Sequence, residues 1–107
     1  MLRTDKQRKV LCTDCPVARV ADLVGDSCSL LILRDLLEKP RRFSELETSL
    51  SGVSSRTLTN KLKLLTTQSL IQHHKPETGH ATYSLTKKGL ALNTLVEEMR
   101  KYGKKYL

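Results

Sequence analysis

Hydrophobic residues recur at helical spacing along this chain, and the clearest stripe lies between residues 54 and 67. Leu58, Leu62 and Leu65 follow the i, i+4, i+7 rule, so they share one face of an expected helix. Ser54 is its expected N-cap, and the helix should run for about 13 residues. The opposite face carries hydrogen-bonding and cationic groups and no carboxylate, namely Arg56, Asn60, Lys63 and Thr67. The pattern therefore predicts a helix with one buried face and one polar, cationic face.

The segments around this helix predict a helix-turn-helix followed by a hairpin. A shorter helix is expected from Ser44 to about Leu50, because Ser44 and Glu47 have the spacing of a capping box. Further on, residues 70–71 start a strand, residues 76–79 read as a turn, and residues 81–85 alternate like a half-buried return strand. We interpret residues 44–67 as a helix-turn-helix and residues 70–85 as a β-hairpin wing.

Two further helices are expected in residues 15–37. Pro16 suits the first helical position, and an apolar stripe of Val17, Val20, Ala21 and Val24 follows before Gly25. The second of these helices should run from about Ser29 to Leu37 and is nearly all aliphatic on its expected buried side. That side consists of Leu30, Leu33, Leu36 and Leu37.

A last helix is expected to open near Thr86 and to run toward Leu107. Its apolar stripe is longer than a small winged domain covers alone, which favours a partner surface. We expect a symmetric homodimer that pairs the first and last helices, with a helix folded back onto its own domain as the alternative. The predicted interface consists of Val17, Val20, Val24, Leu92, Leu95, Val96, Met99, Tyr102 and Tyr106.

Together these elements predict one domain over residues 1–107, mainly α with a small β-hairpin (α+β). The architecture is a winged helix-turn-helix with extra N-terminal and C-terminal dimerisation helices. Residues 1–9 are polar and charged and resemble no signal peptide, and residues 1–14 are expected to form an N-terminal arm. No stretch approaches the roughly 18–20 apolar residues of a membrane span. We therefore expect a cytoplasmic protein that does not bind membranes.

Charge sharpens this picture. The chain has 19 basic and 11 acidic residues and a formal net charge of +8. Nine basic and three acidic residues lie between Lys39 and Lys88, a net charge of +6, whereas residues 1–38 are neutral overall. A basic excess on the expected winged helix is what neutralising DNA phosphates requires. Charge and architecture therefore both predict double-stranded DNA as a partner.

The recognition contacts are expected on the helix that Ser54 caps. Asn60 can read adenine through two hydrogen bonds, and Arg56 can read guanine or hold a phosphate. Basic side chains of the wing and of the segment after it are expected to contact phosphates. A two-fold dimer predicts a palindromic operator with half-sites about one helical turn apart. The predicted DNA contacts are Ser55, Arg56, Thr57, Asn60, Lys63, Lys75, His80, Lys87 and Lys88.

Other classes of function find less support. The sequence has no Ser/His/Asp spacing, no glycine-rich phosphate loop and no carboxylate pair in an apolar setting, so we expect no enzyme and no cofactor. Cys12 and Cys15 form a Cys-x-x-Cys, but no βαβ pattern surrounds it and no second ligand pair follows, so no metal site is expected. A winged helix that binds RNA, or a protein-interaction module without a sensing role, is the alternative.

Several short runs carry a resemblance to a known family. They are Cys15-Pro16, Leu-Ile-Leu-Arg-Asp-Leu at 31–36, Arg-Arg-Phe-Ser-Glu-Leu at 41–46, Val-Ser-Ser-Arg-Thr-Leu-Thr at 53–59, Leu62-Lys63 with Leu65, and Tyr-Ser-Leu-Thr at 83–86 followed by Gly89. On these runs, which cover roughly Cys15 to Tyr106, the chain resembles the HxlR-type (DUF24) winged helix-turn-helix transcriptional regulators, relatives of the MarR class.

The resemblance implies a cytoplasmic, dimeric regulator whose second helix-turn-helix helix enters the major groove. It also implies a response to oxidants, electrophiles or aldehydes through the cysteine before the helix-opening proline, which is Cys15 here. A helix N-terminus stabilises a thiolate, which favours reactivity at Cys15, although a buried, unreactive thiol is the common alternative. Either Cys12 resolves an oxidised Cys15 within one chain or Cys15 pairs across the dimer, and the inducer itself is undefined.

Three positions depart from the family pattern. Cys28 replaces the tryptophan usually found where the second helix begins, and Ser69 replaces the glycine that usually precedes Leu70. Tyr102 stands for a tryptophan of the last helix. The first departure leaves open whether Cys28 joins the redox chemistry.

Overall fold

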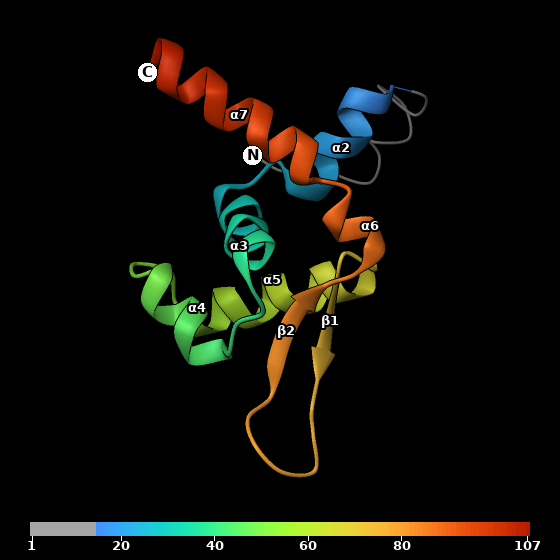
Figure 1. Ribbon diagram of the computed structural model, residues 1–107, viewed down its shortest axis with the longest axis vertical. Coiled ribbons are helices and arrows are strands. Elements are labelled where there is room, and N and C mark those ends of the chain that lie inside the picture. Colours follow the sequence, from blue (N-terminus) through green and yellow to red (C-terminus); the bar gives the residue numbers. More distant parts are fainter. Residues whose placement is uncertain (1–14) are drawn as a thin grey trace.

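The computed structural model describes residues 15–107, so the predicted arm at residues 1–14 and Cys12 lie outside the described residues. The chain is mostly helical with one two-stranded antiparallel sheet, which confirms the predicted fold class. Helices α2 and α7 lie at one end of the molecule and the tip of the hairpin at the other (Figure 1). The elements are α2 (Pro16–Val24), α3 (Ser27–Glu38), α4 (Phe43–Ser49), α5 (Ser55–Thr67), β1 (Ile71–His74), β2 (Thr82–Leu85), α6 (Lys87–Leu90) and α7 (Asn93–Tyr106).

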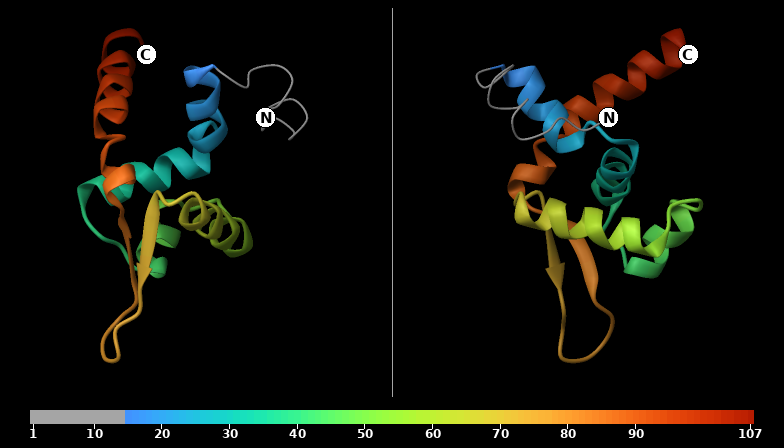
Figure 2. Two further views of the ribbon diagram at one scale, coloured as in Figure 1. Left: turned by 90° about the vertical axis from the view of Figure 1, so that its right-hand side faces the viewer. Right: turned by 180° about the vertical axis from the view of Figure 1, so that it is seen from behind.

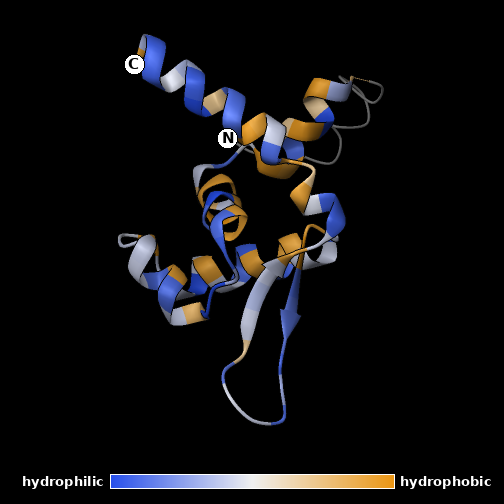
Figure 3. Cartoon of the chain, viewed as in Figure 1, coloured by the Kyte–Doolittle hydropathy of each residue, from blue (hydrophilic) through white to orange (hydrophobic). Residues whose placement is uncertain are grey.

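The core lies where α3, α4 and α5 meet the base of the hairpin. The predicted stripe of Leu58, Leu62 and Leu65 is buried there, which confirms the interpretation of α5. Apolar residues gather in this central region, whereas the hairpin arms are hydrophilic (Figure 3). The other large side chains that are fully buried are Ile32, Leu33, Leu46, Leu70 and Ile71.

Helix α3 begins two residues earlier than the sequence pattern predicts. Its first residue is Ser27 because the Asp26 side chain caps the helix and accepts a hydrogen bond from the Ser29 N–H at 2.9 Å. The Lys61 ammonium of α5 lies 3.5 Å from the same carboxylate. The residue that caps α3 therefore also connects α3 to α5.

The buried face of α3 also differs from the predicted one. Ile32 and Asp35 are buried, whereas Leu30 and Leu37, which the hydrophobic pattern places inside, are only partly covered. A buried carboxylate needs a charged partner, and the Arg34 guanidinium lies 2.9 Å from Asp35 Oδ1. The prediction fails because it ranks positions by hydrophobicity and leaves out this ion pair.

The predicted capping box at Ser44 and Glu47 is wrong. Helix α4 begins at Phe43, and Glu45 Oε1 accepts a hydrogen bond from the Arg42 N–H at 2.9 Å. The carboxylate therefore satisfies a backbone donor at the helix start, but from a position two residues before Glu47.

The start of α4 is set by a contact from outside the helix. Arg41 and Tyr83 form an antiparallel bridge in which each N–H donates to the other's carbonyl, at 3.0 and 2.7 Å. This bridge holds the segment before α4 extended and attaches it to β2. The helix can therefore begin only after Arg42.

Helix α5 ends in a Schellman motif. The Leu70 N–H donates to the Leu65 carbonyl and the Ser69 N–H donates to the Thr66 carbonyl, both at 3.0 Å. Ser69 occupies the left-handed position of the motif, with φ of +62°. This is the position at which the family usually carries glycine, and the geometry gives the physical reason for that preference.

Replacing Ser69 by glycine is expected to raise the free energy of unfolding by about 0.5–1 kcal/mol, because glycine has no Cβ penalty at positive φ. Urea denaturation at fixed protein concentration measures the change. Ser84→Gly, in the extended strand β2, is the matched control and should destabilise the protein. A loss of stability in Ser69→Gly would contradict this account of the turn.

The expected single helix from Thr86 to Leu107 is wrong, because the structure divides it into α6 and α7. Thr86 caps α6 by accepting a hydrogen bond from the Gly89 N–H at 3.1 Å. The chain then turns at residues 91–92, and α7 rises away from the body of the domain (Figure 2). Within residues 15–107, no helix is long and apolar enough to cross a membrane.

Candidate nucleic-acid interface

Helix α5 presents Arg56, Asn60 and Lys63 as exposed side chains. Its rotation is fixed by the buried leucine stripe on the other side and by its cap at Ser54, whose Oγ accepts a hydrogen bond from the Thr57 N–H at 3.1 Å. The predicted cap is therefore confirmed. The outward face of α5 offers one amide and two cations that are long enough to reach base edges or phosphates.

The hydroxyl groups of Ser55 and Thr57 have partners within the chain. Ser55 Oγ donates to Glu47 Oε2 at 2.6 Å, and Thr57 Oγ1 accepts from Ser54 Oγ at 2.9 Å. The first of these bonds holds α4 against the start of α5. Both residues stay predicted DNA contacts, but their hydroxyls also maintain the helix-turn-helix.

The basic side chains of this region fall into two groups. Lys61 pairs with Asp26, and the Lys88 ammonium donates to the Gln68 carbonyl at 3.1 Å, so both also stabilise the fold. The second group consists of exposed side chains, which the structure leaves on the surface of α5, the hairpin and α6. This group includes Lys63, Lys75, His80 and Lys87.

A cleft of about 510 Å³ separates α5 from the hairpin. Lys63 of α5 and Lys75, which directly follows β1, both line it, so the fold brings together two predicted contacts that are distant in sequence. Leu62 contributes the apolar part of the lining. The other lining residues are Thr59, Thr66, Thr67, His73 and Tyr83.

The predicted contact set does not include His73 and Tyr83, although both line this cleft. They are direct partners across the hairpin, and their rings stack at a centroid distance of 4.0 Å with an interplanar angle of 5°. Burial and the nearby Lys75 ammonium lower the pKa of His73, and burial raises the pKa of Tyr83. Strand alternation from the buried Ile71 could have placed His73 on this face.

The two described cysteines lie in different environments. Cys15 is half-buried and has extended backbone angles at the N-cap of α2, directly before Pro16. Cys28 is buried, and burial and the Asp26 carboxylate raise the pKa of its thiol. A raised pKa lowers the thiolate fraction, which makes Cys28 a poor nucleophile. Of residues 15–107, no three His, Cys, Asp or Glu side chains gather as metal ligands.

The predicted dimer residues divide by exposure. Val24 and Val96 are buried within a single chain, and Leu92 is partly buried against the core. Exposed apolar side chains nevertheless remain on both helices, with Val17 78% and Tyr102 60% accessible. The other exposed members of the predicted set are Val20, Leu95, Met99 and Tyr106.

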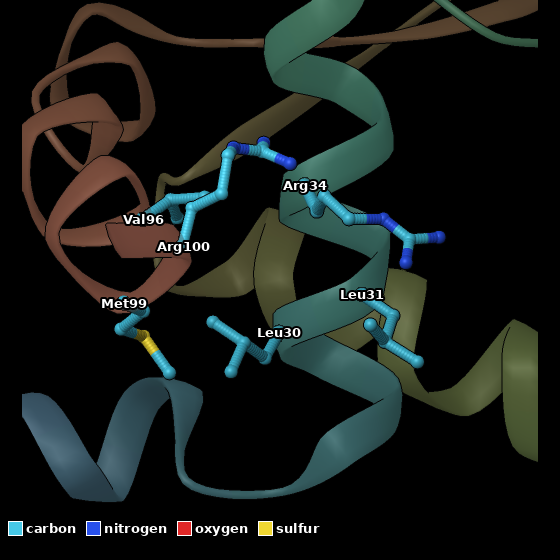
Figure 4. Close-up of a pocket in the computed structure, with 6 residues that line it drawn as sticks. All are labelled: Leu30, Leu31, Arg34, Val96, Met99 and Arg100. Carbon is cyan, nitrogen blue, oxygen red and sulfur yellow. The ribbon is translucent and has the colours of Figure 1, made fainter. Parts of the chain in front are cut away.

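A pocket of about 160 Å³ lies between α3 and α7 beside this surface. Leu30 and Met99 face each other across it, and Val96 completes the apolar side (Figure 4). The Arg34 guanidinium points away from Leu30 and Met99, in keeping with its ion pair to Asp35. Helix α7 therefore covers α3 incompletely in a single chain.

Comparison with known proteins places this architecture among regulators. Residues 23–107 match the HxlR-like helix-turn-helix family. An uncharacterized HTH-type transcriptional regulator of Synechocystis sp., sll1512, is 36% identical over 95 residues, which span 87% of this chain and 70% of that protein. The HTH-type transcriptional regulator YodB of Bacillus subtilis is 31% identical over 97 residues, which span 88% and 87% of the two chains.

Solved structures of YodB from B. subtilis agree with the fold. Its reduced form superposes with a TM-score of 0.75 at 27% identity and covers 86% of this chain and 93% of that one. Its quinone-bound form gives a TM-score of 0.76 and covers 86% and 99%. Both the sequence and the backbone of this chain are therefore similar to those of helix-turn-helix regulators.

Proposed function

The chain belongs to the HxlR-like helix-turn-helix family of transcriptional regulators, and from that premise we propose that it binds a palindromic DNA operator as a homodimer. Membership confirms the resemblance found in the sequence and sets the protein among regulators rather than enzymes. The observation that carries the proposal is the exposed face of α5, with Arg56, Asn60 and Lys63 directed away from the core and the Lys75 end of β1 beside it.

In this proposal α5 enters the major groove and the hairpin lies over the flanking backbone. Asn60 and Arg56 read base edges, because an amide and a guanidinium each form two hydrogen bonds with a purine. Lys75, His80 and Lys87 contact phosphates, and Ser55, Thr57 and Lys88 support the same interface. The protein acts in the cytoplasm, where its DNA is found.

The homodimer joins the apolar side chains that α2 and α7 leave exposed. These helices lie at the end of the molecule opposite the hairpin, so pairing them leaves both copies of α5 and both wings available to one duplex (Figure 1). A two-fold axis between the helices relates the two copies of α5 and of the hairpin, and a palindromic operator has the same symmetry. Val24, Leu92 and Val96 anchor these helices to the core, and the more exposed residues form the contact.

We assign the sensing role to Cys15. Its half-buried N-cap position gives access to oxidants or electrophiles, and the helix N-terminus favours its thiolate, whereas Cys28 is buried with a raised pKa. Structures of the relative YodB are named for a reduced form and a quinone-bound form, which supports a response to oxidation or to quinones in a protein of this fold. The partner of an oxidised Cys15 is Cys12 or a cysteine of the second copy.

Fluorescence anisotropy on a labelled duplex from upstream of the protein's own gene tests both parts. The titration uses physiological salt and excess nonspecific competitor, with the protein first reduced and then treated with diamide. We expect competitor-resistant binding in the reduced state and at least about tenfold weaker binding after oxidation. A tenfold loss corresponds to about 1.4 kcal/mol of coupling between oxidation and DNA binding.

Two cysteine variants test whether the response to diamide depends on Cys15. Cys15→Ser should bind DNA normally and resist diamide, whereas Cys28→Ala should respond to diamide like the wild type. If Cys15→Ser lost DNA affinity in diamide as much as the wild type, Cys15 would not be the sensing residue. Competitor-resistant binding to RNA but not to duplex DNA would replace the proposed function with the RNA-binding alternative.

A further inference from the structure

The cleft between α5 and the hairpin has the chemistry of an anion site. Two ammonium groups, from Lys63 and Lys75, reach it from opposite walls, and Thr59 and Tyr83 add hydroxyl groups. The hydroxyls of the other two lining threonines, Thr66 and Thr67, donate to carbonyls of α5 at 2.8 and 3.0 Å. No carboxylate lines this cleft in the part of the chain that the structure describes. A volume of about 510 Å³ is enough for a phosphodiester group with its water.

His73 lies on the wall of the cleft because of strand alternation. Ile71 is buried toward α5, and His73, two residues later, lies on the same face of β1. The cross-strand partner of His73 is Tyr83, whose ring it stacks against. By the same alternation His74 falls on the opposite face, where it lines a hollow with Thr82 and Ser84 that His73 also borders.

The proposed binding of α5 in the major groove places a DNA backbone strand at this cleft. If α5 lies in the major groove and the hairpin lies over the flanking backbone, the sugar-phosphate strand at the edge of that groove passes between them. Phosphate oxygens accept hydrogen bonds from ammonium, hydroxyl and protonated imidazole groups, and charge-assisted bonds of this kind are the strong ones.

We propose that this cleft holds one backbone phosphate of the bound duplex and that His73 takes up a proton as the phosphate enters. The inference rests on the proposed DNA-binding function and adds a site and a proton to it. Tyr83 holds the imidazole in place by stacking, and an imidazolium on a tyrosine face is further stabilised as a cation–π pair.

The electrostatics of the cleft differ between the unbound protein and the complex. The titratable groups that face His73 are Lys63 from α5, Lys75 from its own arm and the Tyr83 hydroxyl from β2. Burial and the Lys75 ammonium disfavour the protonated form of His73 in the unbound protein. A phosphate anion beside the ring favours that protonated form. His73 is therefore more basic in the complex. DNA affinity is therefore highest at pH values below the pKa that His73 has in the unbound protein. The added affinity is lost as pH rises through the pKa that His73 has in the complex.

The test is the pH dependence of DNA affinity at constant ionic strength, measured by anisotropy between about pH 8 and pH 6. Wild-type affinity should rise about three- to tenfold as pH falls over this range. His73→Gln should bind at pH 8 nearly as well as the wild type and lose the rise. The matched control, His74→Gln, changes the neighbouring histidine on the outer face and should keep the rise.

A second experiment identifies which backbone phosphate occupies the cleft. Duplexes carry one neutral methylphosphonate linkage at successive backbone positions, and one position per half-site should abolish the pH dependence of the wild type. A rise that survives in His73→Gln, or at every methylphosphonate position, would overturn the proposal, as would loss of the rise in His74→Gln. Failure of the wild type to bind any duplex at either pH would instead overturn the proposed function itself.

Discussion

Replacing Asn60 by alanine is expected to weaken operator binding by about 1–3 kcal/mol and to relax sequence preference at one base pair per half-site. Asn60 is exposed on α5 between Arg56 and Lys63, so the substitution removes a potential purine contact without opening the core. Its amide is suited to adenine, which offers one acceptor and one donor in the major groove. Anisotropy on the operator and on duplexes substituted at each position measures both effects.

Lys87→Ala provides the contrast for that experiment. Lys87 is exposed at the start of α6, and we expect its loss to weaken binding about equally on every sequence. The slope of log K against log salt should become shallower by about one, as for a lost phosphate contact. If Asn60→Ala gave this uniform pattern, Asn60 would contact the backbone and another residue would read the base.

Replacing Gly89 by alanine is expected to lower the free energy of unfolding by about 2–3 kcal/mol. A Cβ at this position would lie 2.1 Å from the Leu70 carbonyl oxygen and 3.0 Å from Leu85 Cδ2. The same carbonyl accepts hydrogen bonds from the Thr86 N–H and hydroxyl, so any shift that relieves the clash also weakens the link between α5, β2 and α6. Urea denaturation at fixed protein concentration measures the loss.

Gly103→Ala is the matched control and should change stability in the opposite direction. Gly103 lies inside α7, and no atom comes within 4 Å of a Cβ built there. Alanine in a helix interior with free space is expected to stabilise by about 0.5–1 kcal/mol. Equal destabilisation by both substitutions would show that the close approach of Gly89 to the Leu70 carbonyl is not the reason why alanine is unfavourable at position 89.

The parts of the fold that depend on local pattern could be predicted from the sequence. Helix α5 has a leucine every three or four residues, a serine cap and a matching length, so its start, its buried face and its outward face all follow. The hairpin also follows, because its strands flank a short turn-forming segment. The candidate contacts Arg56, Asn60 and Lys63 follow from the same helical periodicity, because it places them opposite the leucine stripe.

The parts that depend on distant contacts could not be predicted in this way. Two overlapping Glu positions satisfy the spacing of a capping box near α4, and the bridge between Arg41 and Tyr83 selects Glu45 over Glu47. The expected helix from Thr86 onward is interrupted at residues 91–92, after the short helix α6 in which Gly89 packs on the distant Leu70, and no local periodicity marks that break. The buried Asp35 likewise depends on a charged partner rather than on hydropathy.

The candidate site shows the same division. Local charge predicts Lys63 and Lys75 separately, but the cleft that they share exists only once α5 packs against the hairpin. The partnership of His73 and Tyr83 requires the exact strand register, which pairs His73 with Tyr83 and His74 with Thr82. A shift by one residue would move His73 to the outer face and place Gln72 and His74 on the cleft face instead.

The most direct test of the central claim is selection of bound sequences from a pool of random duplexes, carried out on the reduced full-length protein with sequencing of the bound fraction. A homodimer that reads DNA through α5 predicts enrichment of an inverted repeat whose half-sites lie about 10 base pairs apart, centre to centre. Asn60→Ala should lose the preference at one position of each half-site. Recovery of sequences with no shared motif would contradict sequence-specific recognition by this face of α5.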